Sequence, residues 1–179
     1  LPYRHIGGVA EMRALISSGA LGEIFAANLV HHSARGPETQ WIYDVTKSGG
    51  GCLVDSGAHL VDLALWILGH ESALGVEGRT FRGGKRLIDT RGTAEDFVTA
   101  RLLLGNVEAS LSCSWKLHVG QDSVIEAPFL GTKGAVRLAN VQGSPLDFVV
   151  ERLCGTERQV IASPPDAWRG RALFSWVHK

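Results

Sequence analysis

Three residues whose side chains carry acid/base chemistry recur along one stretch of the chain. Asp55, His59 and Asp62 are spaced i, i+4 and i+7, which places them on one stripe of a helix. A carboxylate one turn from an imidazole can fix its tautomer and raise its pKa, as a general acid/base requires. Because buried ionisable groups need partners or a purpose, the stripe predicts Asp55 and His59 as a catalytic pair.

Two structural alternatives stay open for these residues. Asp55 stands near the expected helix start, where it is also suited to cap backbone N–H groups. A single histidine among apolar neighbours is commonly a hydrogen-bonded core residue. The three glycines at 49–51 favour the functional alternative, because they permit close backbone approach to a ligand.

The stripe lies on a stretch that predicts one buried helix, from about Val54 to a closing Gly69. This helix is apolar nearly all the way round, through Leu60, Val61, Leu63, Ala64, Leu65, Trp66, Ile67 and Leu68. No apolar run approaches the ~20 residues that span a bilayer, so we expect no membrane partner.

The segments before this helix predict a helix, a strand and a long connection. Residues 9–18 have a helical period and end at Gly19. Residues 23–32 read as a strand with apolar residues on both faces, which favours a central position in a sheet. Residues 33–48 form a long polar connection that contains Trp41, and connections of this length are commonly functional.

After Gly69 the pattern is one of strands, with a basic loop at 82–93. Strands are expected at 72–81, 96–104, 107–115, 122–130, 135–139, 146–153 and 159–161, with turns at 105–106, 131–134 and 155–157. Helices early and strands late predict an α+β fold, an open, largely antiparallel sheet with helices on one face. The other face, lined by Ser, Thr and charged side chains, meets either solvent or a second copy of the chain.

Length and composition bound the function. A chain of 179 residues predicts a single domain over 1–179. The 18 basic residues balance 18 acidic ones, so net charge attracts neither nucleic acid nor an anionic membrane. Cys52, Cys113 and Cys154 are odd in number and widely spaced, which favours a reducing, cytoplasmic location over a zinc site or a disulfide framework. The chain starts at Leu1 and stops inside a helical pattern at 168–179. We therefore expect it to be part of a longer protein.

Other motifs are weak or missing in the sequence. No strand–GxGxxG–helix unit occurs, so we expect no dinucleotide-binding domain within this chain. Residues 131–134 resemble a fragment of a phosphate-binding loop, but a hairpin turn explains them better. His31 and His32 point to opposite faces of one strand. One of them together with Asp55 and His59 would form a zinc or manganese site, which we keep only as an alternative.

Three polar residues follow the strand whose outer face is rich in serine. Just past the end of this strand come Lys116, His118 and Gln121. At this position the edge of the expected sheet could reach a pocket. A solvated turn explains them equally well.

The run from Gly49 to Gly69, GGGCLVDSGAHLVDLALWILG, resembles the central motif of the C-terminal domain of the Gfo/Idh/MocA oxidoreductases, the glucose-fructose oxidoreductase and inositol dehydrogenase group. SGALGEI at 18–24 is similar to that family's helix-to-strand junction, and GTKG at 131–134 to its late hairpin. The similarity extends over roughly residues 9–138.

The resemblance implies a two-domain enzyme whose N-terminal half binds NAD or NADP. The half represented here would bind a sugar, polyol or related hydroxy compound and form homo-oligomers through its open sheet face. His59 then matches the family's acid/base and Asp55 its carboxylate partner, while Trp41, Lys116, His118 and Gln121 would lie near the substrate. The family's Glu-Lys-Pro motif belongs to the other half and does not occur in this sequence. We therefore expect this chain alone neither to bind NAD nor to turn over.

Two alternatives belong to other functional classes. A non-catalytic scaffold or ligand-binding module would keep the sheet for assembly and lose the chemistry. A metal-dependent hydrolase or isomerase would require stoichiometric metal in the purified protein.

Overall fold

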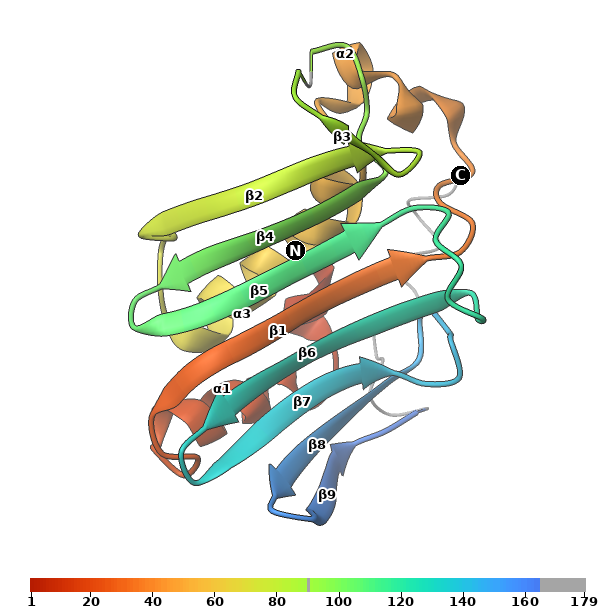
Figure 1. Cartoon of the computed structure of the whole chain (residues 1–179). Coiled ribbons are helices and arrows are strands. Elements are labelled where there is room, and N and C mark those ends of the chain that lie inside the picture. Colours follow the sequence, from red (N-terminus) through yellow and green to blue (C-terminus); the bar gives the residue numbers. More distant parts are fainter. Residues whose placement is uncertain (90, 165–179) are drawn as a thin grey trace.

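The structure is a computed structural model that describes residues 1–89 and 91–164. Figure 1 shows its two layers, a broad twisted sheet and a layer of helices behind it. The described residues form a nine-stranded sheet in the order β3-β2-β4-β5-β1-β6-β7-β8-β9. The helical pattern at 168–179 lies outside the described residues.

The elements have the following bounds. The strands are β1 (Ile24–Ser33), β2 (Gly75–Arg82), β3 (Lys85–Leu87), β4 (Phe97–Leu104), β5 (Val107–Ser114), β6 (Ser123–Gly131), β7 (Gly134–Asn140), β8 (Phe148–Cys154) and β9 (Glu157–Ala162). The helical segments are η1 (Pro2–His5), α1 (Val9–Ser17), η2 (Gln40–Tyr43), α2 (Val45–Ser48), η3 (Leu53–Gly57) and α3 (Ala58–Leu68).

The topology confirms the α+β class with an open, largely antiparallel sheet. Neighbouring strands are antiparallel, except that β1 runs parallel to β5. As expected for a strand with two apolar faces, β1 is central. It separates β5 from β6, so the late strands form two meanders and not a continuous one. This arrangement is possible because a crossover that contains the helices, and not a hairpin, joins β1 to β2.

Two predicted loops contain regular structure. The basic loop at 82–93 begins with the short strand β3, which pairs with the end of β2. The connection at 33–48 contains η2 and α2, and α2 begins where the Asp44 side chain accepts a hydrogen bond from the Thr46 N–H at 3.1 Å. Such short elements carry too little periodicity to be read from sequence.

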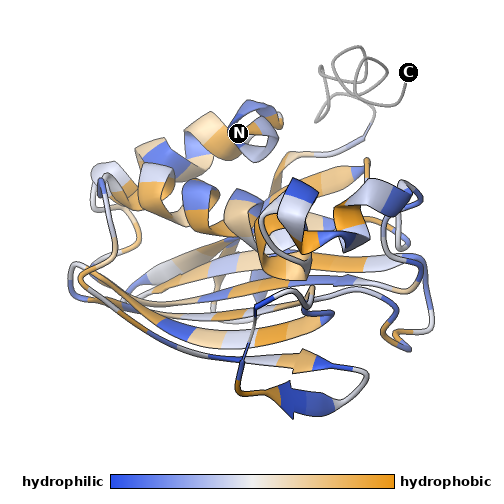
Figure 2. Cartoon of the chain, turned by 90° about the horizontal axis from the view of Figure 1, so that it is seen from above, coloured by the Kyte–Doolittle hydropathy of each residue, from blue (hydrophilic) through white to orange (hydrophobic). Residues whose placement is uncertain are grey.

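The core lies between the helices and one face of the sheet, as Figure 2 shows. Alternate residues of each strand point toward α1 and α3, and this face of β5 carries Val107, Ala109 and Leu111 as the sequence pattern predicted. The largest fully buried side chains include Met12, Leu29, Leu60, Leu63, Leu104, Phe129, Leu138 and Phe148.

The helix predicted from Val54 to Gly69 is present, but it is not uniform. It begins with the π-helical turn η3, continues as α3, and ends where Gly69 adopts a positive φ of 74°. Residues Val45–Leu68 together reach the length and hydropathy of a membrane span, more than the sequence pattern indicated. The glycines at 49–51 interrupt this segment, and α3 buries one face against the sheet, as a core helix does.

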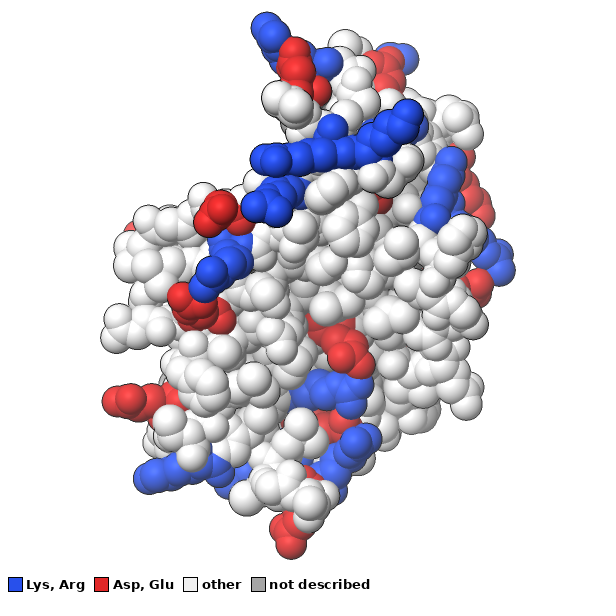
Figure 3. Space-filling view, in the orientation of Figure 1, with Lys and Arg blue, Asp and Glu red and all other residues white. Residues whose placement is uncertain are grey.

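The opposite face of the sheet carries no helix among the described residues. Figure 3 shows this open face as broad areas without charge, with several clusters in which acidic and basic side chains lie together and a band of basic side chains across its upper part. Two such clusters are ion pairs: Arg101 binds Glu108 at 2.6 Å, and Arg137 bridges Glu126 and Glu151.

Candidate active site

A buried carboxylate fixes the start of the segment that carries Asp55 and His59. Glu95 accepts hydrogen bonds from the Gly51 N–H at 2.9 Å and the Leu53 N–H at 3.0 Å, and its carbonyl oxygen accepts from the Cys52 N–H. A Cβ added to Gly51 would lie 2.6 Å from the Glu95 backbone nitrogen. Gly51 is therefore required by the chain's own backbone, whereas the sequence suggested approach to a ligand.

The Asp55 carboxylate is held by side chains. Its Oδ2 accepts from the indole Nε1–H of Trp115 at 2.9 Å and from the Ser56 hydroxyl at 3.1 Å. Asp55 does not cap the helix. No side chain caps the start of η3, and the amides of Gly51 and Leu53 donate to the Glu95 carboxylate. Asp55 lies in the π-helical turn, a distortion that is frequent at functional sites.

The third member of the stripe has a structural partner. The Asp62 carboxylate accepts from Arg4, whose Nε lies 2.6 Å from Oδ2. Asp62 therefore ties η1 to α3, and the acid/base chemistry is left to Asp55 and His59.

His59 lies half-buried beside Asp55, with its ring centroid 5.8 Å from that of Tyr3. Its Nδ1 is buried, and no group among the described residues hydrogen-bonds to it. Burial lowers the pKa of His59, and the charge of Asp55 opposes this effect. The net direction is thus opposite to the one predicted from the i, i+4 spacing, because desolvation outweighs the carboxylate.

A second imidazole lies on the same side of the sheet. The Tyr3 hydroxyl is 3.3 Å from His31 Nδ1, and burial lowers the pKa of His31 to about 4, although the nearby charge of Asp55 acts against this. Burial also raises the pKa of Tyr3, so its phenol stays protonated and can donate to His31. His31 is therefore neutral at physiological pH, and in the tautomer with its proton on Nε2 its Nδ1 accepts the hydrogen bond from Tyr3.

His32 points to the open face, as strand alternation predicted. Its Nδ1 lies 2.8 Å from the Ser114 hydroxyl and its Nε2 lies 3.3 Å from that of Ser112. Among the described residues no group of three or more His, Cys, Asp or Glu side chains is arranged to hold a metal ion. The geometry therefore offers the metal alternative no support within this part of the chain.

The four predicted substrate-binding residues lie in two connections, Trp41 between β1 and α3 and the other three between β5 and β6. Trp41 is half-exposed in η2. The Lys116 ammonium lies 4.9 Å from the ring centroid of Tyr43, and Gln121 donates to the Ser123 carbonyl at 3.0 Å. His118 is exposed after β5. No hydrogen bond joins any of these four residues to Asp55 or His59 in the described part of the chain, and their role in substrate binding stays a prediction.

The sequence model of the GFO/IDH/MocA C-terminal domain matches residues 9–137, which is most of the chain. The chain belongs to this family.

Individual relatives place the family domain within longer proteins. The chain is 25% identical over 140 residues to D-glucoside 3-dehydrogenase of Escherichia coli K12, covering 72% of this chain and 40% of that protein. It thus spans less than half the length of this curated relative.

Two solved structures share the fold. Aldose-aldose oxidoreductase of Caulobacter crescentus, crystallised with glycerol, has a TM-score of 0.71 at 22% identity, covering 90% of this chain and 46% of that one. An inositol dehydrogenase homologue of Azotobacter vinelandii, complexed with NAD⁺, has a TM-score of 0.69 at 19% identity, covering 89% and 41%. At these identities the similarity establishes the fold of the GFO/IDH/MocA domain.

Sequence reasoning missed three residues that this GFO/IDH/MocA domain brings to Asp55 and His59. Trp115, Glu95 and Tyr3 stand 60, 42 and 56 positions from Asp55, Leu53 and His59 respectively, so no local motif contains them. A hint existed only for Trp115, since the alternation of β5 placed it on the helix-facing side.

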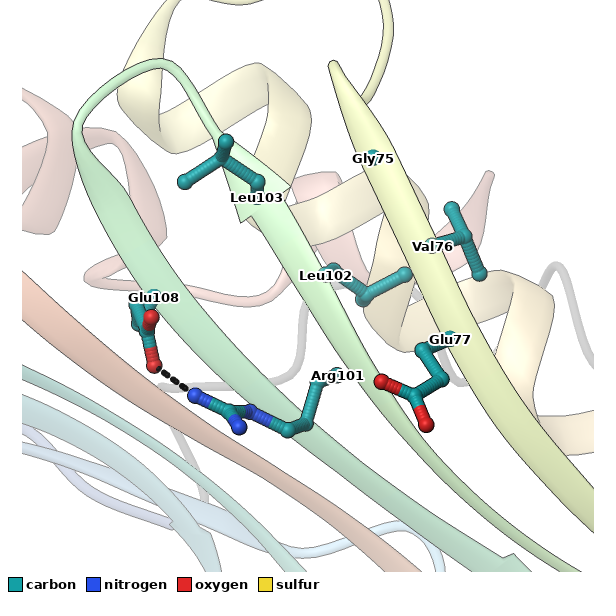
Figure 4. A pocket seen from close by; sticks show the side chains of 7 residues that line it. All are labelled: Gly75, Val76, Glu77, Arg101, Leu102, Leu103 and Glu108. Atoms are coloured by element: carbon teal, nitrogen blue, oxygen red, sulfur yellow. Dashed lines mark hydrogen bonds and ion pairs between the residues drawn. The ribbon is translucent and has the colours of Figure 1, made fainter.

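Two hollows of the GFO/IDH/MocA domain lie away from His59. One, of about 230 Å³, is open between β2 and β4 and is lined by Glu77, Arg101, Leu103 and Glu108, among others (Figure 4). The other lies at the β8–β9 hairpin. Neither contains an acid/base pair of the kind formed by Asp55 and His59.

Proposed function

We propose that this chain is the substrate-binding and oligomerisation half of an NAD(P)-dependent oxidoreductase that acts on a sugar, a polyol or a related hydroxy compound. The observation that carries the proposal is a half-buried His59 whose Nδ1 has no hydrogen-bond partner within residues 1–89 and 91–164, and beside which the Asp55 carboxylate is fixed in place. Family membership supports the reaction class, and the glucoside and aldose relatives support the substrate class.

His59 is suited to exchange a proton with a substrate hydroxyl. Its lowered pKa keeps the imidazole neutral near pH 7, so it is ready to accept the proton. Asp55 stabilises the imidazolium that forms through its charge. Because His59 takes the hydroxyl proton while the substrate carbon is oxidised, no free alkoxide has to form.

In this proposal the nicotinamide cofactor is bound mainly by the upstream half of the full-length protein. The described residues contain no glycine-rich strand–helix turn for a pyrophosphate, whereas the neutral imidazole of His59 suits the proton side of the reaction. A bound nicotinamide would supply the hydride acceptor. This chain's own residues would bind and orient the hydroxyl and take its proton.

The test is made in the full-length protein that contains the upstream half. We expect His59→Ala to lower kcat by at least about 100-fold, and the exposed His5→Gln to leave it unchanged, in an assay that follows reduced nicotinamide on candidate sugars and polyols. Retained activity of the His59 variant would reject the role of this residue.

The two alternatives give different results in the same protein. A non-catalytic module binds no nicotinamide nucleotide in calorimetry, and its His59→Ala variant changes stability alone. A metal-dependent hydrolase or isomerase contains stoichiometric metal in elemental analysis.

We also propose that a second copy of this chain covers the open sheet face. Several charges on this face are paired within the chain, and between them β1 and β6 present Val30, Val124 and Pro128. Such a surface suits sheet-on-sheet packing. We expect Val30→Arg to halve the mass measured by light scattering, whereas Val54→Arg on the helical side does not change it. If the unmodified chain is already monomeric, this part of the proposal fails.

A cytoplasmic location completes the proposal. It is supported by three free cysteines, of which Cys154 is exposed, since such thiols persist where the environment is reducing.

A further inference from the structure

The hydrogen bonds of Asp55 and His59 are unequally distributed. Asp55 Oδ2 accepts from both Trp115 and Ser56. In contrast, His59 Nδ1 is buried and lacks any partner among the described residues. The pair stands one helical turn apart, yet the carboxylate is directed to the indole and not to the imidazole. Something must hold it there, because an ionised carboxylate near an imidazole gains from a direct hydrogen bond.

The indole of Trp115 is rigidly placed. Its side chain is 3% exposed, and its ring packs edge-on against Tyr43 with 5.2 Å between centroids. Its backbone N–H donates to the Asp96 carbonyl at 2.8 Å. On another side, a Cβ added to Gly36 would come within 3.2 Å of Trp115 Cβ. A buried indole N–H requires an acceptor, and Asp55 provides it.

We propose that Trp115 is a positioning residue for the acid/base pair: its indole N–H holds the Asp55 carboxylate away from His59, so that Asp55 acts on the imidazole through charge and not through a hydrogen bond. This inference rests on the proposed function for its catalytic meaning. The geometry it describes belongs to this chain alone and is testable without turnover.

Several other groups face His59 and must be considered in any titration. Tyr3 approaches from η1, His31 from β1, and Asp62 from the next turn of α3. Asp62 is already paired with Arg4, and Tyr3 is directed to His31. Asp55 is thus the group whose release would alter His59 most.

The experiment is an NMR titration of the His59 ring in the 179-residue chain, with the resonance assigned by a His59→Gln variant. In Trp115→Phe the freed carboxylate can bond to His59 Nδ1–H, and we expect the His59 titration midpoint to rise by about one pH unit. Trp66→Phe is the matched control, because Trp66 stacks on Arg13, and it should leave the midpoint unchanged. An unchanged midpoint in folded Trp115→Phe overturns the proposal. Because burial lowers the pKa of His59, entry of water would also raise the midpoint, so a rise of the same size in Trp115→Phe/Asp55→Asn relative to Asp55→Asn overturns it as well.

A second variant covers the case in which Trp115→Phe does not fold. In Asp55→Asn we expect the Trp115 indole N–H resonance to move upfield, because its charged acceptor is gone. A resonance that does not move shows that the indole has another acceptor and overturns the proposal.

The full-length protein separates this inference from the proposed function. If it is a dehydrogenase, Trp115→Phe should shift the pH profile of kcat in the direction of the His59 midpoint, with little change in KM for the nucleotide. If it has no dehydrogenase activity, the proposed function fails, and the NMR result still decides whether Trp115 holds Asp55.

Discussion

The two faces of the sheet differ in how their polar side chains are hydrogen-bonded. The adjacent residues His31 and His32 of β1 point to opposite faces and show this contrast. His32 on the open face has a serine hydroxyl at each ring nitrogen, and Ser110 donates to Asn28 nearby. On the helical face His59 has a buried nitrogen that bonds to no group in the part of the chain that the structure describes, and His31 is neutral near the Asp55 carboxylate.

Buried polar groups are nearly always hydrogen-bonded, so an exception calls for a reason. The open face satisfies its groups and can pack against another surface without cost from orphaned polar atoms. The helical face leaves one nitrogen of an acid/base group without a hydrogen bond from the described part of the chain. The two faces therefore suit different roles, assembly on one and chemistry on the other.

The largest expected difference is in how much a glycine substitution on each side lowers the free energy of unfolding. We expect Gly51→Ala to lower the free energy of unfolding by about 4 kcal/mol or more, because its Cβ would overlap the Glu95 backbone. Gly75→Ala, whose Cβ would lie 3.8 Å from Leu103 Cβ at the sheet edge, should change it by less than about 1 kcal/mol. Urea denaturation followed by circular dichroism measures both. Equal effects would mean that Gly51 is not constrained by Glu95.

Acid should destabilise the helical face through His31. The unfolded imidazole takes up its proton near pH 6.5 and the folded one only near 4, so the unfolded state binds more protons between these values. Stability is complete above about pH 6.5 and falls as the pH drops to 4, by up to about 3 kcal/mol from this group. We expect His31→Gln to flatten this part of the profile, which denaturation at a series of pH values would reveal. A profile as steep as that of the unmodified chain would contradict the assignment.

A smaller difference in lost stability is expected between replacing a buried carboxylate and replacing an exposed one. Glu95→Gln removes a charged acceptor for two buried amides and should cost about 2 kcal/mol. Glu108→Gln breaks a solvent-exposed pair with Arg101 and should have no measurable effect, since exposed ion pairs contribute little. Thermal unfolding of the two variants compares them directly. A larger loss in Glu108→Gln would place the greater constraint on the open face.

Much of the fold could be predicted from sequence because it rests on local patterns. Alternation defined β4 and β5, the Gly-Asn pair defined their hairpin, and Gly69 marked the end of α3. The direction of His31 and His32 to opposite faces followed from the two-residue period of a strand. What escaped was the pairing of β1 with β5, because strand order depends on a crossover whose path no local pattern records.

The candidate site divides in the same way. The sequence by itself determined that Asp55 and His59 lie one turn apart on a mostly apolar helix, since helical geometry fixes neighbours at that spacing. Only the tertiary structure decided what each one touches. It brings Trp115 to Asp55, Arg4 to Asp62 and Glu95 to the amides of Gly51 and Leu53, because the sheet and helix layers join segments that lie tens of residues apart in the chain. For the same reason the direction of the His59 pKa follows from burial, a property that the chain acquires only when it folds.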